Sequence, residues 1–257
     1  MTLKFIILGC GSSLGVPRAD GFFGKCDPKE KKNLRTRCSA LINFKNFNIL
    51  IDTSPDLRNQ LISNKIKTID KVFYSHPHAD QTHGINDLRI FYLKNRKKIP
   101  VFADMITQNY LKSTFGYCFK KSFDYPATLE LKNLKKKHIF INNKKKVLIH
   151  SISVKHGKIN SMSFIINNKC AYVSDASFIF TKDFKYFKNI KYFIIDCLRY
   201  KAHPSHFNLS GVLSLIKLLQ PKKTILTNLH TDLDYRTLIN LLPKNVVPAY
   251  DGMTFNI

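Results

Sequence analysis

The stretch Ser75-His76-Pro77-His78-Ala79-Asp80-Gln81-Thr82-His83-Gly84 decides the fold and the chemistry of this chain. It follows the apolar run Lys71-Val72-Phe73-Tyr74, which predicts a short strand. In extended backbone, residues two apart point the same way, so His76 and His78 can reach one ion while Asp80 continues along that edge. Pro77 disfavours the helical region for His76 and keeps it extended. Because imidazole and carboxylate groups bind Zn²⁺, Mn²⁺ and Fe²⁺, the stretch predicts a metal site at a strand end.

Composition favours a soluble globular α/β protein. The 257 residues are 44% hydrophobic, which is enough for a substantial core. No apolar run approaches the roughly 20 residues that span a bilayer, and Met1 to Leu8 leads into a glycine turn without a cleavage-site pattern. We therefore expect a cytoplasmic protein that has no membrane partner. The six cysteines contain no CxxC pair, so we expect buried thiols and no disulfide scaffold.

The chain is strongly basic, with 42 Lys and Arg against 17 Asp and Glu and a net charge of +25. Such a charge attracts polyanions, and nucleic acid is one partner that it permits. The lysines are spread along the whole chain, as in Lys135-Lys136-Lys137 and Lys144-Lys145-Lys146. This distribution favours a compositional bias with solvated turns over a dedicated nucleic-acid surface.

The apolar periodicity predicts an alternation of short strands and helices. Strands are expected at Leu3–Leu8, Ala40–Phe44, Phe47–Ile51, Lys71–Tyr74, Ile99–Phe102, Lys146–Val154, Ser161–Ile166, Cys170–Val173, Tyr192–Ile195 and Thr224–Leu226, with a terminal strand pair over Val246–Phe255. Helices are expected at Pro55–Leu61 with Ser54 as N-cap, and at Ile85–Leu93, Asp104–Phe115, Leu209–Leu219 and Tyr235–Leu242. Lys45-Asn46 predicts a hairpin turn, and residues 116–137 read as an irregular basic connection. We expect one domain, residues 1–257, in which two sheets pack together with helices outside.

The chain resembles the metallo-β-lactamase fold hydrolases over essentially its whole length. Their signature HxHxDH corresponds here to His76, His78 and Asp80, with Gln81 in place of the last histidine. Three further segments resemble the branch that contains phosphoribosyl 1,2-cyclic phosphate phosphodiesterase: Leu8–Pro17, Leu50–Arg58 and Pro248–Gly252. The resemblance implies an α/β fold of the four-layer αβ/βα type, with two mixed β-sheets flanked by helices. It also implies hydrolysis of a phosphoester or of another bond by a metal-bound hydroxide.

The same resemblance implies a set of metal ligands. His76, His78 and His156 would hold the first ion, Asp175 would bridge, and Asp80 and His230 would complete the second site. Gln81 stands where the family has a further histidine, so three interpretations remain open: a looser second site, a site tuned to Mn²⁺ or Fe²⁺, or a single-metal enzyme. We favour two divalent ions, Zn²⁺ or Mn²⁺, with a weak second site. Gln81 is then a weak ligand, and His83 is a candidate to orient a ligand from outside.

Asp80 and His206 are the expected catalytic residues. His206 lies in a segment that resembles the stretch where the family keeps a histidine near the leaving group, and it would protonate the departing oxygen. His203 is the alternative acid, and both histidines could instead cap the helix that follows. Arg35 and Arg37, in the basic loop before Cys38, could meet an anionic substrate or lie exposed.

The favoured function is a phosphodiesterase that opens a small cyclic phosphate ester, with a small anionic phosphoester as its partner. A nuclease of the tRNA 3′-processing type is the first alternative, because it shares the metal motif and would explain the charge. A family member that binds a metabolite without turnover is the second, because of Gln81. The sequence also leaves a homodimer open.

Overall fold

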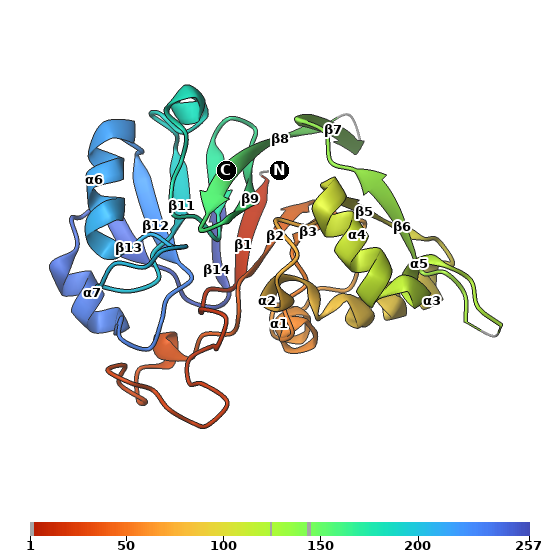
Figure 1. Ribbon diagram of the computed structural model, residues 1–257, viewed down its shortest axis with the longest axis horizontal. Helices are drawn as coiled ribbons and strands as arrows, with labels where there is room; N and C mark the ends of the chain where they lie inside the picture. The colour runs from red at the N-terminus through yellow and green to blue at the C-terminus, as the bar shows by residue number, and fades with distance from the viewer. Residues whose placement is uncertain (1–2, 124, 143–144) are drawn as a thin grey trace.

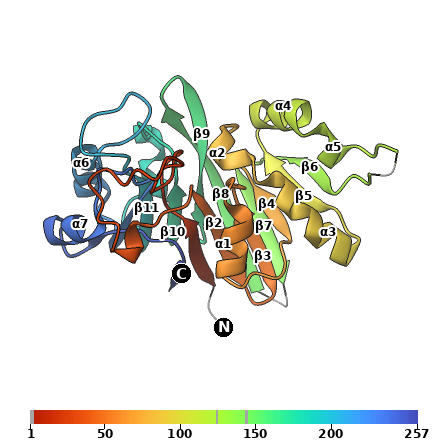
Figure 2. The same cartoon turned by 90° about the horizontal axis from the view of Figure 1, so that it is seen from below.

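The computed structural model describes residues 3–123, 125–142 and 145–257. Two seven-stranded sheets pack face to face, and helices cover the outer face of each (Figures 1 and 2). This is the αβ/βα sandwich predicted above. Among the described residues, no helix has both the length and the apolar composition needed to cross a membrane.

The first sheet has the order β14-β1-β2-β3-β4-β5-β6. Its strands are β1 (Lys4–Gly9), β2 (Ser39–Phe44), β3 (Phe47–Ile51), β4 (Lys71–Phe73), β5 (Ile99–Ala103), β6 (Leu129–Asn133) and β14 (Met253–Asn256). The pairs from β14 to β3 are antiparallel, and those from β3 to β6 are parallel. Lys45 adopts a positive φ of 56° between β2 and β3, which confirms the hairpin predicted at Lys45-Asn46.

The second sheet has the order β13-β12-β11-β10-β9-β8-β7. Its strands are β7 (Lys137–Asn142), β8 (Lys145–His156), β9 (Ile159–Ile166), β10 (Cys170–Val173), β11 (Tyr192–Asp196), β12 (Lys223–Thr227) and β13 (Val246–Pro248). Antiparallel pairs link β7 to β10, and parallel pairs link β10 to β13.

The helices lie outside the sheets. The first sheet carries α1 (Leu57–Ser63), α2 (Ala79–Thr82), α3 (Arg89–Asn95), α4 (Met105–Thr114) and α5 (Gly116–Phe119), while the second carries α6 (Leu209–Leu219) and α7 (Tyr235–Leu241) (Figure 2). Short 3₁₀ turns occur at Lys31–Asn33, Ile85–Leu88 and Thr181–Tyr186.

The core forms three apolar layers, as a four-layer sandwich requires. Alternate residues of one strand enter different layers: Phe5 of β1 faces the second sheet, where its ring lies 5.7 Å from Tyr172, whereas Ile6 packs on the helix side with Leu57. Burial on both faces explains why these strands read as continuous apolar runs.

Several details differ from the sequence-based expectation. Strand β7 was not predicted, and the helix expected at Ile85–Leu93 is a 3₁₀ turn over Ile85–Leu88 followed by α3. The terminal strand pair was wrong, because β13 pairs with β12 in the second sheet while β14 crosses to β1 in the first. Residues 116–137 contain α5 and β6, whose apolar positions are too few to show a period. Helix α1 begins at Leu57 instead of Pro55, with Asp56 at the N-cap.

The carboxyl ends of several strands meet at one edge of the sandwich. β4 of the first sheet leads to His76, while β10, β11 and β12 of the second lead to Asp175, Asp196 and Asn228. A backbone hydrogen bond of 2.9 Å from Met162 of β9 to the carbonyl of Ser75 joins the two sheets there. The carboxyl edge of parallel strands is where such folds place their ligands.

Candidate metal centre

Three imidazoles form a compact cluster at this edge. His76 Nε2 lies 3.0 Å from His78 Nδ1, and His156 Nε2 lies 3.3 Å from the same atom. Neighbouring nitrogens around a tetrahedral Zn²⁺ with bonds of about 2.0–2.1 Å are separated by about 3.3–3.4 Å. The three residues predicted to hold the first ion therefore come together with the spacing of such an ion's ligands.

Hydrogen bonds from outside the cluster fix which nitrogen of His76 and His156 faces inward. Ser75 Oγ donates to Asp52 Oδ2 at 2.8 Å, so at 3.0 Å it accepts from His76 Nδ1 and leaves Nε2 free. The backbone carbonyl of Ser205 accepts from His156 Nδ1 at 2.7 Å, with the same result. Both rings are thereby oriented for coordination through Nε2.

The protonation state of the imidazoles also suits the binding of a cation. Burial lowers the pKa of His76 to about 3, and burial lowers the pKa of His156 from its ordinary value. Neutral imidazoles are the form in which histidine binds a metal. The donor set thus fits a divalent ion.

The Asp80 and Asp175 carboxylates lie beside this cluster. Asp175 falls within coordinating reach of His156. Gln81 Nε2 donates to Asp80 Oδ2 at 3.1 Å and to Asp175 Oδ2 at 3.2 Å, so it joins the two carboxylates. Burial and the Asp175 charge raise the pKa of Asp80 to about 6. Asp80 arrives on the first turn of α2 and not along an extended edge, which corrects that part of the prediction.

His206 forms a hydrogen-bonded pair with Asp196. His206 Nδ1 lies 2.7 Å from Asp196 Oδ2 and 4.0 Å from Asp175 Oδ1, and its ring centroid is 4.7 Å from that of His156. His206 also forms a second group of potential metal ligands with His156 and Asp175, beside the group of His76, His78 and His156. Its Nδ1 is bonded to Asp196, so Nε2 is the nitrogen that remains free. Burial opposes protonation of His206, but Asp196 outweighs it and raises the pKa of His206 to about 9.

Several of these groups line a cavity of about 340 Å³. Its lining comprises Ser12, Ser13, Leu14, His78, Asp80, His156, Asp175, Leu198, Arg199, His203, Ser205, His206, Asn228 and His230. His230 thus faces the same space, but its Nδ1 lies 3.2 Å from Asp232 Oδ1, and within the described ranges it belongs to neither group of potential metal ligands.

Three other predicted site residues have different partners. Arg35 is buried and contacts Asn33 Oδ1 at 3.0 Å, while Arg37 forms a two-pronged ion pair with Asp56 at 2.6 and 2.7 Å. His83 contacts the Tyr110 hydroxyl at 2.9 Å. Neither arginine nor His83 belongs to the cavity lining.

Sequence reasoning missed the residues that support the ligands. The sequence predicted the strand Tyr192–Ile195 but no role for Asp196, the residue that follows, which is fully buried and holds His206. Asn228 Nδ2 donates to Asp175 Oδ1 and to Asp196 Oδ1, both at 3.2 Å, and so links the two acids. Asp196 and Asn228 share one sequence feature that could have indicated their role: each is a polar residue at the end of a buried apolar run.

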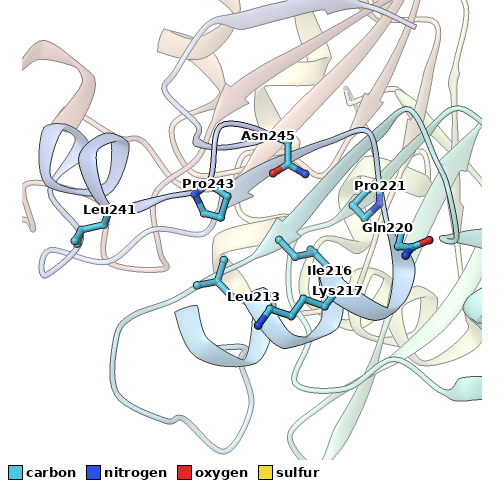
Figure 3. A pocket seen from close by; sticks show the side chains of 8 residues that line it. All are labelled: Leu213, Ile216, Lys217, Gln220, Pro221, Leu241, Pro243 and Asn245. Carbon is cyan, nitrogen blue, oxygen red and sulfur yellow. The ribbon is translucent and has the colours of Figure 1, made fainter.

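A larger hollow of about 750 Å³ lies elsewhere, between α6 and the segment that leads into β13 (Figure 3). Its lining residues include one titratable side chain, Lys217, and no histidine or carboxylate. The chemistry therefore belongs to the smaller cavity.

Comparison with known proteins agrees with this geometry. Residues 47–228 match the model of the β-lactamase superfamily domain. The structure of a diphosphatase from the PhnP family superposes with a TM-score of 0.88 at 26% identity, covering 100% of this chain and 98% of that one. Zinc-bound PqqB from Methylobacterium extorquens (TM-score 0.77, 13% identity, 99% and 100% covered) and the short form of human tRNase Z (0.69, 16%, 99% and 99%) share the fold.

A curated relative is longer than this chain. An octanoyltransferase from Porphyromonas gingivalis is 28% identical over 255 residues, which cover 98% of this chain and 51% of that protein. The chain thus spans about half of that relative's length. Fold, family match and cluster agree, and the chain belongs to the metallo-β-lactamase fold hydrolases, in their PhnP-like branch.

Proposed function

We propose that this protein is a metal-dependent phosphodiesterase that acts on a small phosphoester, most favourably a cyclic phosphate ester. The observation that carries the proposal is the His206–Asp196 pair, whose imidazole ring lies 4.7 Å from that of His156. Ester hydrolysis needs an activated water and a proton for the leaving oxygen, and the two halves of this site offer both.

Each residue has a defined part in this proposal. His76, His78 and His156 would hold Zn²⁺ or Mn²⁺, which when bound supplies Lewis-acid activation of water and of the phosphoryl group. His206 Nδ1 donates to Asp196, which leaves Nε2 to deliver a proton to the departing oxygen. Asn228 keeps Asp175 and Asp196 in place by donating to both.

The cavity favours a small substrate. A volume of about 340 Å³ is at the lower end of the roughly 300–1,000 Å³ typical of small-molecule sites. Among the described residues, Arg199 is the one lysine or arginine in the cavity lining, and it supports the recognition of an anion of limited charge.

Two alternatives have specific motivations. A nuclease of the tRNA-processing type would explain the net charge of +25, and in that case binding to tRNA should weaken steeply with salt. The substitution of Gln81 motivates a member that binds a metabolite without turnover. Octanoyl transfer is not assigned to this chain, because the chain matches only half of the protein that carries that name.

We further propose that residues 1–257 act as one domain in the cytoplasm. The central core layer combines Phe5 and Ile257 from the two ends of the chain with Val147 from its middle, which supports a single folding unit. All six cysteines are free and buried, as is usual in a reducing compartment.

A substrate panel tests the proposal. Protein reloaded with Zn²⁺ or Mn²⁺ is assayed on a ribose cyclic phosphate, a linear dialkyl phosphodiester, a dinucleoside diphosphate and a precursor tRNA. We expect the highest kcat/KM on the cyclic ester at physiological salt. Preferred cleavage of the tRNA would establish the nuclease, and no turnover of any substrate would establish the binding module.

A further inference from the structure

Gln81 is held rigidly at the centre of the acidic half of the site. Its side chain is fully buried, its backbone N–H donates to the His78 carbonyl at 3.1 Å, and its carbonyl accepts from Thr53 N at 2.8 Å. With the backbone fixed on both sides, the amide can reach only a small region. There its Nε2 donates to Asp80 Oδ2 and Asp175 Oδ2, at 3.1 and 3.2 Å.

This arrangement does not fit the second ion that the fold family implies. That ion would take Asp80, Asp175 and His230 together with a ligand from position 81. An amide nitrogen has two protons and no lone pair for a cation, so both carboxylates already face a donor. Gln81 Oε1, the atom that could coordinate, is buried and has no hydrogen-bond partner within the part of the chain that the structure describes.

The opposite orientation of the Gln81 amide would be less favourable in the protein without a second ion. It would set Oε1 about 3 Å from two carboxylate oxygens, and an uncompensated contact of this kind between acceptors is repulsive. His230 keeps Nε2 free, because its Nδ1 lies 3.2 Å from Asp232 Oδ1, but among the described residues it does not fall into a group of closely spaced potential metal ligands.

We propose that the Gln81 amide replaces the second cation, so that this centre binds a single divalent ion at His76, His78 and His156. The two N–H groups of Gln81 hold Asp80 and Asp175 together, a task that an ion performs in a two-metal site. The inference rests on the proposed metal dependence but concerns only the number of ions. It departs from the sequence-based prediction of two ions with a weak second site.

Metal counting tests the inference without any assay of activity. Protein stripped by a chelator is titrated with Zn²⁺ and with Mn²⁺ by calorimetry, and the ions retained after gel filtration are measured by mass spectrometry. We expect one equivalent in the wild type. Loss of a residue that only hydrogen-bonds to a metal ligand already weakens metal binding by about 10–100-fold. Because the second site lacks a ligand at position 81, a second ion should bind at least about 100-fold more weakly than the first.

Two variants sharpen the test. Gln81→His restores an imidazole, and Gln81→Glu creates a third carboxylate that lacks the amide protons, so each should add a second tight equivalent. Gln220→His, on the exposed C-cap of α6, controls for adventitious binding by an added histidine and should stay at one.

Crystals soaked in Zn²⁺ should show one anomalous peak in the wild type and two in Gln81→His. Two equivalents of similar affinity in the wild type, or one in both position-81 variants, overturns the inference. One equivalent without hydrolysis of any ester overturns the proposed function and leaves this inference standing.

Discussion

His206 and Asp196 form a hydrogen bond of 2.7 Å between Nδ1 and Oδ2, with the Asp196 side chain fully buried and that of His206 15% exposed. Burial raises the pKa of Asp196 to about 7, and its attraction to His206 raises the pKa of the imidazole to about 9. At neutral pH the proton therefore resides on His206, which makes this ring an acid that is ready to act.

The pair predicts a shift in the pH profile of Asp196→Asn. The acid is present below the pKa of His206 and is lost as pH rises through it, so wild-type kcat/KM on a dialkyl phosphodiester should fall above about pH 9. Without the Asp196 carboxylate, burial lowers the His206 pKa while only Asp175 and Asp80 still raise it, so the fall should begin at a lower pH than in the wild type. Profiles recorded with constant metal content check this, and an unchanged alkaline limb would remove His206 from the role.

His206→Ala should affect substrates unequally. Esters with an alkoxide leaving group should lose about 10²–10⁴-fold in kcat, whereas bis(p-nitrophenyl) phosphate should lose little because its phenolate needs no proton. His203→Ala is the matched control, since His203 lines the same cavity but bonds to Ser205 Oγ at 3.1 Å. Equal losses on both esters would indicate a structural role, and a selective loss in His203→Ala would transfer the acid to that residue.

Ser75→Ala should weaken the metal site without touching a ligand. Its hydroxyl links Asp52 to His76 Nδ1, so removing it frees the ring to rotate and to change tautomer. Metal affinity should drop by about 10–100-fold, measured by competition with a chelating dye. Ser161→Ala is the control, because Ser161 Oγ is 3.5 Å from the same nitrogen, and an equal drop there would show that Ser75 has no special part.

Sequence patterns predicted most of the sandwich, because burial on both faces makes its strands apolar throughout. They also indicated His76 and His78, whose spacing and position after a strand are local features, whereas His156 was identified only through the resemblance to the family. The supporting contacts could not be predicted, because each joins residues far apart in the chain: His156 with Ser205, Asn228 with Asp175, and β14 with β1.

The role of Gly157 could not be predicted from the sequence either. Its φ is +57°, and a Cβ at this position would lie only 2.7 Å from Ser205 Cβ. Both facts explain why glycine follows His156, but only once the neighbouring loop is known. Arg35 and Arg37 looked like substrate ligands in the sequence because nothing there reveals that Asn33 and Asp56 engage them.

The most direct test of the account is a metal titration of wild type and His78→Ala. His78 is exposed, so its loss should spare the fold, yet its Nδ1 lies within 3.3 Å of both other imidazoles. Stripped wild type should gain hydrolysis of bis(p-nitrophenyl) phosphate in proportion to bound Mn²⁺ or Zn²⁺. His78→Ala, with an unchanged circular dichroism spectrum, should bind no tight equivalent and stay inactive. Full activity and normal metal content in this variant would contradict the three-imidazole centre.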